Sequence, residues 1–184
     1  MQSELIRSIL IIAAGNSEYE FLQKVKPIIN PNIRNSNCKV DIKRSDNSSN
    51  GSIPKMLDYC NRISIDLNYD EKYVVTDYDR CLANSEENEA NTLSERLNIK
   101  ILYNRPSLEA TILTILDSNK KTYYQNQKTD KLKKELRNTI DFSKSTHSIS
   151  GLISSSKFNP TLEQLKNVRQ NLAIIEDLFN IFNN

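Results

Sequence analysis

The sequence has no tryptophan, one histidine, three glycines and three cysteines among its 184 residues. The cysteines, Cys38, Cys60 and Cys81, are odd in number and show no zinc-ligand spacing, which argues against a disulfide framework and a zinc site. The single His147 lies in a polar run and is interpreted as a solvated loop residue rather than half of a catalytic Cys–His pair. Carboxylates are therefore the expected carriers of any chemistry.

Long apolar runs and a strong excess of one charge are missing as well. The longest uninterrupted apolar stretch, residues 9–14, is far shorter than the roughly 20 residues that a membrane-spanning helix needs. Lys and Arg total 25 against 23 Asp and Glu, and this near-balance excludes a histone-like polycation or an acidic chaperone tail. The first residues lack the pattern of a signal peptide. We expect a cytoplasmic protein that does not enter the membrane.

Apolar and amphipathic segments alternate over the first 118 residues. The pattern predicts four β-strand–α-helix pairs, at 5–13 and 18–25, 38–43 and 53–67, 72–76 and 84–97, and 99–103 and 107–116. Pro27 and Pro31 are expected to end the first helix. Alternation of this kind indicates an α/β fold with a four-stranded, mainly parallel sheet flanked by helices. Residues 1–118 are therefore assigned to an α/β core.

Residues 119–184 are predicted to form a C-terminal helical extension, packed on the core or on a partner. It should contain a basic helix over 130–140, a Ser/Thr-rich connection over 143–157 and one long amphipathic helix over 160–182. The apolar stripe of that helix comprises Leu162, Leu165, Val168, Leu172, Ile175, Leu178, Phe179 and Phe182. Because the stripe is longer than the flank of a small sheet needs, we expect its end, around Ile175, Phe179 and Phe182, to bury against a second chain or a partner.

Two acidic residues stand at the end of the third predicted strand. Ligands of open parallel sheets bind beyond the C-terminal ends of the strands, where Asp77 and Asp79 would lie. Two carboxylates this close repel each other, and a hard cation such as Mg²⁺ or Mn²⁺ relieves the repulsion. The alternative is purely structural: Asp77 caps the following segment, and Asp79 pairs with Arg80 or a lysine.

Three short segments together resemble a nuclease family. Ala14–Glu18 is similar to a Glu-Gly-x-x-(Ser/Thr)-Glu motif, Asp77–Asp79 to an Asp-x-Asp strand end, and Asn104–Glu109 to a Ser-Asn-Pro-x-Phe-Glu helix start. This combination resembles the RloB-like family of Toprim-like nucleases, which is related to the Toprim domains of OLD nucleases. The resemblance spans about residues 8–116.

The resemblance implies a Toprim-like sheet and a Mg²⁺- or Mn²⁺-dependent endonuclease, with Asp77 and Asp79 as metal ligands and Glu18 and Glu109 as further catalytic carboxylates. It also implies a toxic effector of an antiphage, abortive-infection system that acts on RNA, tRNA included, or on DNA. The resemblance further implies an ATPase partner, and the chain has no Gly-x-x-x-x-Gly-Lys-(Ser/Thr) loop of its own. The structural alternatives are that Glu18 complements a helix dipole and that Glu109 caps a helix.

The chain departs from the family at one catalytic position. Ala14 stands where the family has its first glutamate, so the chain as given is expected to be inactive in phosphodiester chemistry. Either the protein is a degenerate homologue that binds without cutting, or a glutamate has been replaced by alanine to suppress toxicity. In the second case, Ala14→Glu should place a third carboxylate beside Asp77 and Asp79 and restore cleavage.

Basic residues predict where a nucleic acid would bind. The expected substrate contacts are Arg105, Lys120, Lys121, Lys131, Lys134 and Arg137. Tyr123 and Tyr124 are interleaved with these lysines and could stack on exposed bases, although an ordinary solvated helix would look the same. The competing function is a non-catalytic α/β module whose C-terminal helix docks on a partner protein such as an ATPase. Homo-oligomerisation is a separate expectation. A receiver-like signalling domain is a weaker alternative. It would need a phosphoacceptor aspartate and a lysine after the last strand, whereas Lys100 lies within a predicted strand.

Overall fold

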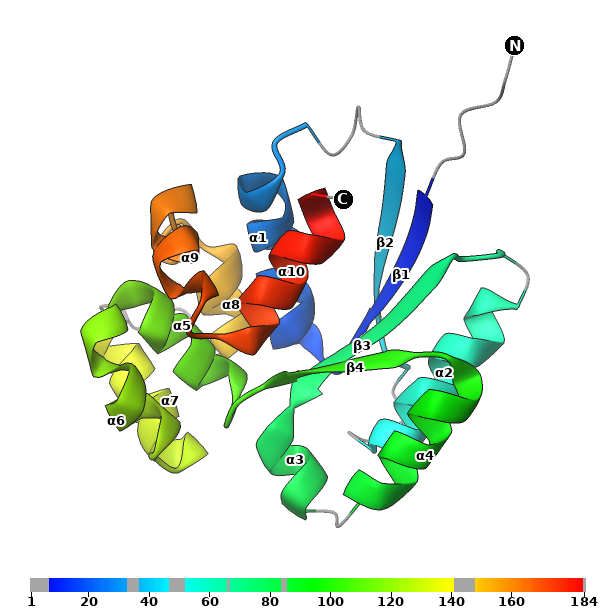
Figure 1. The fold of residues 1–184 in the computed structure, drawn as a ribbon. Helices are drawn as coiled ribbons and strands as arrows, with labels where there is room; N and C mark the ends of the chain where they lie inside the picture. Colours follow the sequence, from blue (N-terminus) through cyan, green and yellow to red (C-terminus); the bar gives the residue numbers. More distant parts are fainter. Residues whose placement is uncertain are drawn as a thin grey trace.

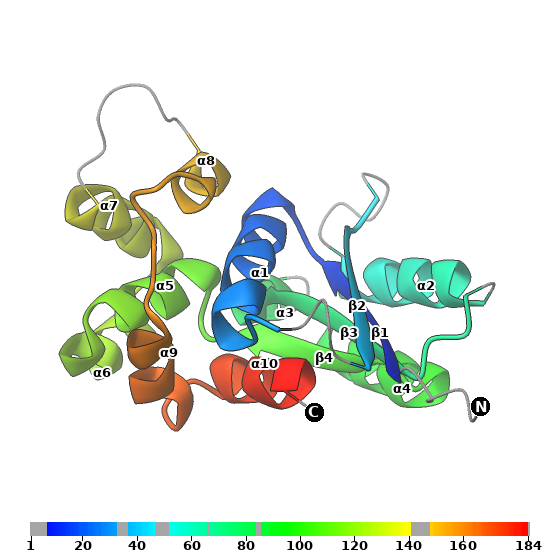
Figure 2. The same ribbon diagram turned by 90° about the horizontal axis from the view of Figure 1, so that it is seen from above.

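The fold is an open parallel β-sheet with helices on both faces (Figures 1 and 2). The structure, a computed structural model, describes residues 7–32, 37–46, 52–65, 67–83, 86–140 and 148–183. The four strands are β1 (Arg7–Ala13), β2 (Cys38–Arg44), β3 (Glu71–Asp77) and β4 (Lys100–Asn104). They are all parallel, in the order β2-β1-β3-β4. The predicted α/β class and the four-stranded sheet are confirmed.

The central strand β1 is buried on both faces, as its isoleucine-rich sequence predicts. Ile9 and Ile11 belong to one hydrophobic cluster, whereas Leu10 and Ile12 belong to a second cluster on the opposite face. This alternation follows from the two-residue period of a strand. Every odd residue of β1 therefore faces one layer of helices and every even residue faces the other.

Different helices cover the two faces of the sheet (Figure 2). α2 (Ile53–Ser64) and α4 (Glu87–Leu97) cover one face, and α1 (Asn16–Ile29) covers the other. A short helix, α3 (Tyr78–Ala83), follows β3 directly. α1 continues past Pro27, contrary to prediction, because a proline in the last turn removes a single backbone hydrogen bond. Connections from the central β1 and β3 diverge to opposite faces, and ligand crevices form at such a switch point.

The second half of the chain packs on the α1 face of the same sheet. It consists of α5 (Leu108–Leu116), a 3-10 turn η3 (Ser118–Lys120), α6 (Lys121–Gln125), α7 (Thr129–Thr139), α8 (Ile149–Ser154), α9 (Leu162–Arg169) and α10 (Ala173–Asn183). α8 and α10 both contact α1, and α10 also contacts β4. One hydrophobic cluster joins Ile9 and Val75 of the sheet to Leu136, Phe158 and Phe182. The helical extension therefore shares its core with the sheet.

The long C-terminal helix predicted over 160–182 is wrong, because two helices meet there at a break over 170–172. α9 begins with a capping box in which Thr161 and Gln164 satisfy each other's backbone N–H groups. Ile175, Phe179 and Phe182 are buried within this chain, where α10 lies against α1 and β4. The expectation that they bury against a second chain is therefore wrong as well.

Two further predictions concern the connection over 143–157 and the absence of a membrane-spanning helix. The connection predicted over 143–157 contains the unpredicted α8, whereas His147 lies outside the described residues. Within the described ranges, no helix has the length and the apolar composition that crossing a bilayer requires.

Candidate active site at the edge of the sheet

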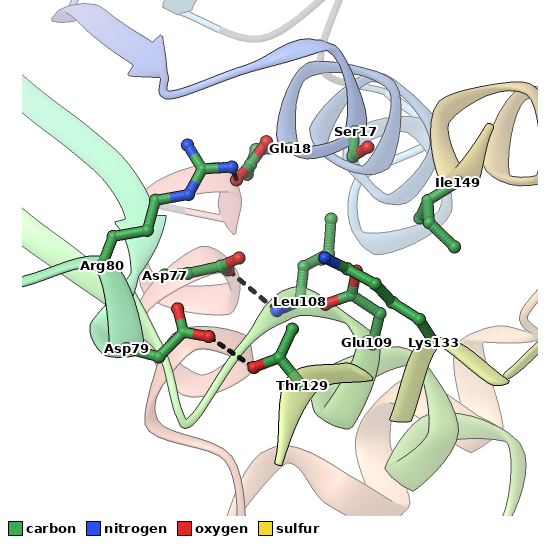
Figure 3. A pocket seen from close by; sticks show the side chains of 10 residues that line it. All are labelled: Ser17, Glu18, Asp77, Asp79, Arg80, Leu108, Glu109, Thr129, Lys133 and Ile149. Carbon is green, nitrogen blue, oxygen red and sulfur yellow. Dashed lines mark hydrogen bonds and ion pairs between the residues drawn. The ribbon is translucent and has the colours of Figure 1, made fainter. Parts of the chain in front are cut away.

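A pocket of about 410 Å³ opens beyond the C-terminal ends of the central strands (Figure 3). It lies at the switch point between β1 and β3, where an open α/β sheet is expected to bind ligands. The lining residues come from five helices and from the end of β3: Ser17, Glu18, Asp77, Asp79, Arg80, Leu108, Glu109, Thr129, Lys133 and Ile149.

The pocket brings together four carboxylates that the sequence singled out. Asp77 is the last residue of β3, and Asp79 lies in the first turn of α3. Glu18 and Glu109 lie in the first turns of α1 and α5. Figure 3 shows all four around one opening, although residues 18, 77 and 109 are far apart in the chain. The motifs quoted for the family resemblance therefore meet in one place.

Three of these carboxylates are almost completely buried. The exposed fractions are 2% for Glu18, 7% for Asp77 and 6% for Glu109. Burial, reinforced by the neighbouring charges of Glu18 and Glu109, raises the pKa of Asp77 well above its ordinary value. Burial also raises the pKa of Glu18, against the attraction of Arg80, whose Nη2 lies 3.8 Å from Glu18 Oε1. The pocket thus favours any species that neutralises these groups, whether protons or a cation.

Hydrogen bonds fix the two aspartates in different ways. The backbone N–H of Leu108, the first residue of α5, donates to Asp77 Oδ1 at 2.8 Å. The hydroxyl of Thr129 donates to Asp79 Oδ2 and so ties α7 to the end of the sheet. Among the described residues, Asp77 bonds to α5 and Arg80 pairs with Glu18, so neither of these contacts is the one that the structural alternative proposed.

Helix N-termini converge on the pocket and supply positive potential. α1, α5 and α7 all begin there, as their first-turn residues Glu18, Glu109 and Thr129 show. The free N–H groups and the dipole of a helix N-terminus stabilise nearby negative charge, and they bind phosphates for the same reason. The site is therefore built to hold carboxylates and has the potential to attract a phosphate.

The donor set fits a hard divalent cation, although the side chains are not gathered around one point. Four carboxylates face two cationic side chains, Arg80 and Lys133, which leaves two negative charges when all six groups are ionised. Glu109 Oε2 is buried and has no hydrogen-bond partner among the described residues. Carboxylate oxygens are the ligands that Mg²⁺ and Mn²⁺ prefer. Across the described ranges, however, no three His, Cys, Asp or Glu side chains have the spacing of a metal centre, so binding an ion would require side chains to rotate.

Ala14 lies outside the pocket. Its side chain is 8% exposed and belongs to the cluster of Leu10, Ile12 and Met56, on the face covered by α2 and α4. Next to it, a Cβ at Gly15 would lie 3.1 Å from Glu18 Oε2, so the glycine leaves room for that carboxylate. Glu18, in the first turn of α1, lines the pocket, whereas residue 14 does not.

The predicted basic residues separate into different environments. Lys131 and Lys134 line an open groove between α6 and α7, while Lys120 pairs with Asp117 at 3.2 Å. The Arg105 guanidinium lies 3.6 Å above the Tyr78 ring. Lys121 and Arg137 line neither the acidic pocket nor this groove.

The acidic pocket also contains residues that were not predicted for the site. Thr129 and Lys133 are four residues apart on α7 and therefore share the face that borders the pocket. Their four-residue spacing predicts a shared helix face. Assigning that face to the pocket, however, also requires the position of α7 relative to β3, which the spacing does not give. Ile149 comes from α8, which was predicted as irregular.

Comparison of the chain with family profiles, with curated proteins and with solved structures finds no match. The fold and the site define an α/β protein with a doubly covered parallel sheet and an acidic pocket at its switch point. The Toprim-like resemblance rests on the three motifs and stays a prediction.

Proposed function

We propose that this protein is a divalent-cation-dependent nuclease whose reaction centre is the pocket of Glu18, Asp77, Asp79 and Glu109. The observation that carries the proposal is the burial of three carboxylates around one opening, with repulsion and burial raising the pKa of Asp77. Strongly perturbed acids in a cleft are characteristic of functional sites, because structure alone gains nothing from the repulsion. The converging helix N-termini support a phosphate-containing substrate.

Each side chain has a distinct role in this proposal. Asp77, Asp79 and Glu18 would hold Mg²⁺ or Mn²⁺, which supplies positive charge against the charge that builds on the phosphate. Glu109, whose Oε2 is unpartnered, is placed to accept the proton of the attacking water. As the water oxygen bonds to phosphorus, the bond from phosphorus to the leaving oxygen breaks. Lys133 faces the pocket and would neutralise a phosphate oxygen.

The biological setting is proposed on the resemblance alone. RNA or DNA is the substrate class, an ATPase is the expected partner, and antiphage defence is the expected context. Toxicity on expression is the corresponding cellular prediction.

A cleavage assay tests the proposal. The chain is incubated with total tRNA, structured RNA and plasmid DNA, with Mg²⁺, Mn²⁺ or EDTA. Because residue 14 lies outside the pocket, we expect the chain as given to cleave in the presence of the ion, in place of the inactivity that Ala14 suggested. Glu18→Gln should abolish this cleavage, whereas Glu20→Gln in the same helix, outside the pocket, should retain it. Failure to cleave any of the three substrates would contradict the nuclease proposal, and absence of thermal stabilisation by either ion would in addition contradict a metal site.

A second candidate, the non-catalytic binding module, is favoured by one observation. Position 14, where the resemblance requires a glutamate, carries a buried alanine that faces away from the pocket. Such a module would still be stabilised by an ion and would bind nucleic acid or a partner, but it would cut no substrate under any of these conditions.

A further inference from the structure

An open groove of about 730 Å³ lies between α6 and α7, separate from the acidic pocket. Its lining combines an aromatic ring, two ammonium groups and polar side chains: Tyr123, Lys131, Lys134, Glu135, Asn138 and Thr139. Both helices lie at the edge of the molecule, beside α5 (Figure 1). The groove therefore offers a surface on which a charged, ring-containing ligand could lie.

The surrounding segment is strongly basic. Residues 118–140 carry seven lysines and arginines and two carboxylates, a net charge of +5 against +2 for the whole sequence. The rest of the chain is consequently net negative. A polyanion would be drawn to this segment, since lysines that neutralise phosphates release counterions.

Tyr123 contacts two neighbouring side chains but is not covered. Its ring contacts the buried Tyr124 edge-on, with centroids 5.6 Å apart and an interplanar angle of 66°. Lys131 Nζ lies 5.0 Å from the Tyr123 ring centroid, and Gln127 Oε1 accepts a hydrogen bond from the same ammonium at 2.8 Å. Tyr123 nevertheless remains 40% exposed, unusual for a large apolar side chain in this protein. An exposed aromatic ring beside lysines is the arrangement on which unpaired bases stack.

We infer that the α6–α7 groove binds a single-stranded stretch of nucleic acid, with a base stacked on Tyr123 and phosphates on Lys131 and Lys134. This inference rests on the proposed function, because it specifies single-stranded nucleic acid as the substrate of the acidic pocket. Stacking requires a free base face, which a duplex does not offer without unstacking. The groove and the acidic pocket lie on different faces of α7, so about one helix diameter, 10–12 Å, separates them. At about 3.4 Å per nucleotide, roughly three nucleotides span that distance.

Fluorescence anisotropy with labelled oligouridylate, oligothymidylate and a duplex of equal length tests the inference, in EDTA so that no cleavage occurs. We expect both single strands to bind more tightly than the duplex. Tyr123→Ala should weaken single-strand binding about five- to a hundredfold, whereas Tyr123→Phe should bind like the parent. Lys131→Gln or Lys134→Gln should each weaken binding and reduce the salt slope by about 0.7, while Lys55→Gln on α2 should change neither.

The inference is overturned if neither single strand binds, or if Tyr123→Ala binds like the parent. It is also overturned if the duplex or polyglutamate binds with the same dependence on Tyr123, since the groove would then accept any polyanion. An unchanged melting temperature of Tyr123→Ala, expected for a partly exposed side chain, shows that the variant is folded. Binding in EDTA does not depend on cleavage, so Tyr123-dependent binding without metal-dependent cleavage would refute the proposed function and leave this inference standing.

Discussion

Asp77→Asn is the variant that examines the electrostatics of the pocket most directly. The asparagine keeps an oxygen where Asp77 Oδ1 accepts the N–H of Leu108 at 2.8 Å, and it removes the charge that Glu18 and Glu109 repel. We therefore expect the variant to be more stable than the parent at pH 8 in EDTA. Stabilising substitutions of the charge-optimising kind commonly add about 0.5–2 kcal/mol. For a chain of this size, that gain corresponds to a rise in melting temperature of about 1–8 °C.

The pH dependence has a defined sign. Because the pKa of Asp77 is raised by burial and by its acidic neighbours, the folded state holds this proton more tightly than the unfolded state does. Its contribution to stability is therefore complete below about pH 4, the ordinary aspartate value, and is lost as the pH rises through the folded-state pKa. The advantage of Asp77→Asn should shrink toward pH 4 and be largest at alkaline pH. Urea unfolding at a series of pH values measures this difference.

The change in stability on adding a divalent cation distinguishes a metal site from simple repulsion between the carboxylates. At an ion concentration of about ten times the dissociation constant, the parent should gain about 1.4 kcal/mol, or roughly 3–6 °C. Asp77→Asn should lose most of that gain, and Asp58→Asn, at an exposed position on α2, should retain it. The reasoning is refuted if Asp77→Asn is less stable than the parent at pH 8 in EDTA. Equal ion responses of Asp77→Asn and the parent would remove Asp77 from any metal site.

Three other substitutions test packing and contacts outside the pocket. Phe179→Ala should cost about 3–5 kcal/mol in urea unfolding, because the ring is buried in this chain's own core; a loss below 1 kcal/mol would show that α10 is loosely packed. Lys24 Nζ donates to the Ile153 carbonyl at 2.9 Å, so Lys24→Met should speed hydrogen exchange in α8 at least several-fold, and unchanged exchange would contradict this role. Ala14→Glu should lower the melting temperature and add no cleavage, because residue 14 faces the cluster under α2. New metal-dependent cleavage by Ala14→Glu would instead place residue 14 in the reaction centre, as the resemblance implies.

The strands were predictable because their apolar residues are buried on the two faces of a central sheet. The run from Ile9 to Ala13 leaves no polar position on either face, and this pattern is typical of a strand between two helical layers. The break between α9 and α10 was not predictable from periodicity. Leu172 lies between these helices yet is buried, so it continues the apolar spacing of Val168 and Ile175 across the break. Hydrophobic spacing alone does not show where backbone hydrogen bonding stops.

The site was predictable only as far as it depends on strand ends and first helical turns. Asp77 and Asp79 follow from the end of β3, and Glu18 and Glu109 from the starts of helices after β1 and β4. Thr129 and Lys133 belong to the site because α7 packs on α5, a long-range contact that no local pattern encodes.

The structural and functional interpretations of the glutamates describe the same physical arrangement. Glu18 and Glu109 lie in first helical turns, where the helix dipole stabilises a carboxylate, and that stabilisation allows their burial beside Asp77. Three helices starting at one opening stabilise more negative charge there than one helix would. A cation bound to the carboxylates would leave the potential of these N-termini available to an incoming phosphate. Capping and phosphate attraction therefore have a common origin in the convergence of α1, α5 and α7, which the order of the strands and the folding back of α7 produce.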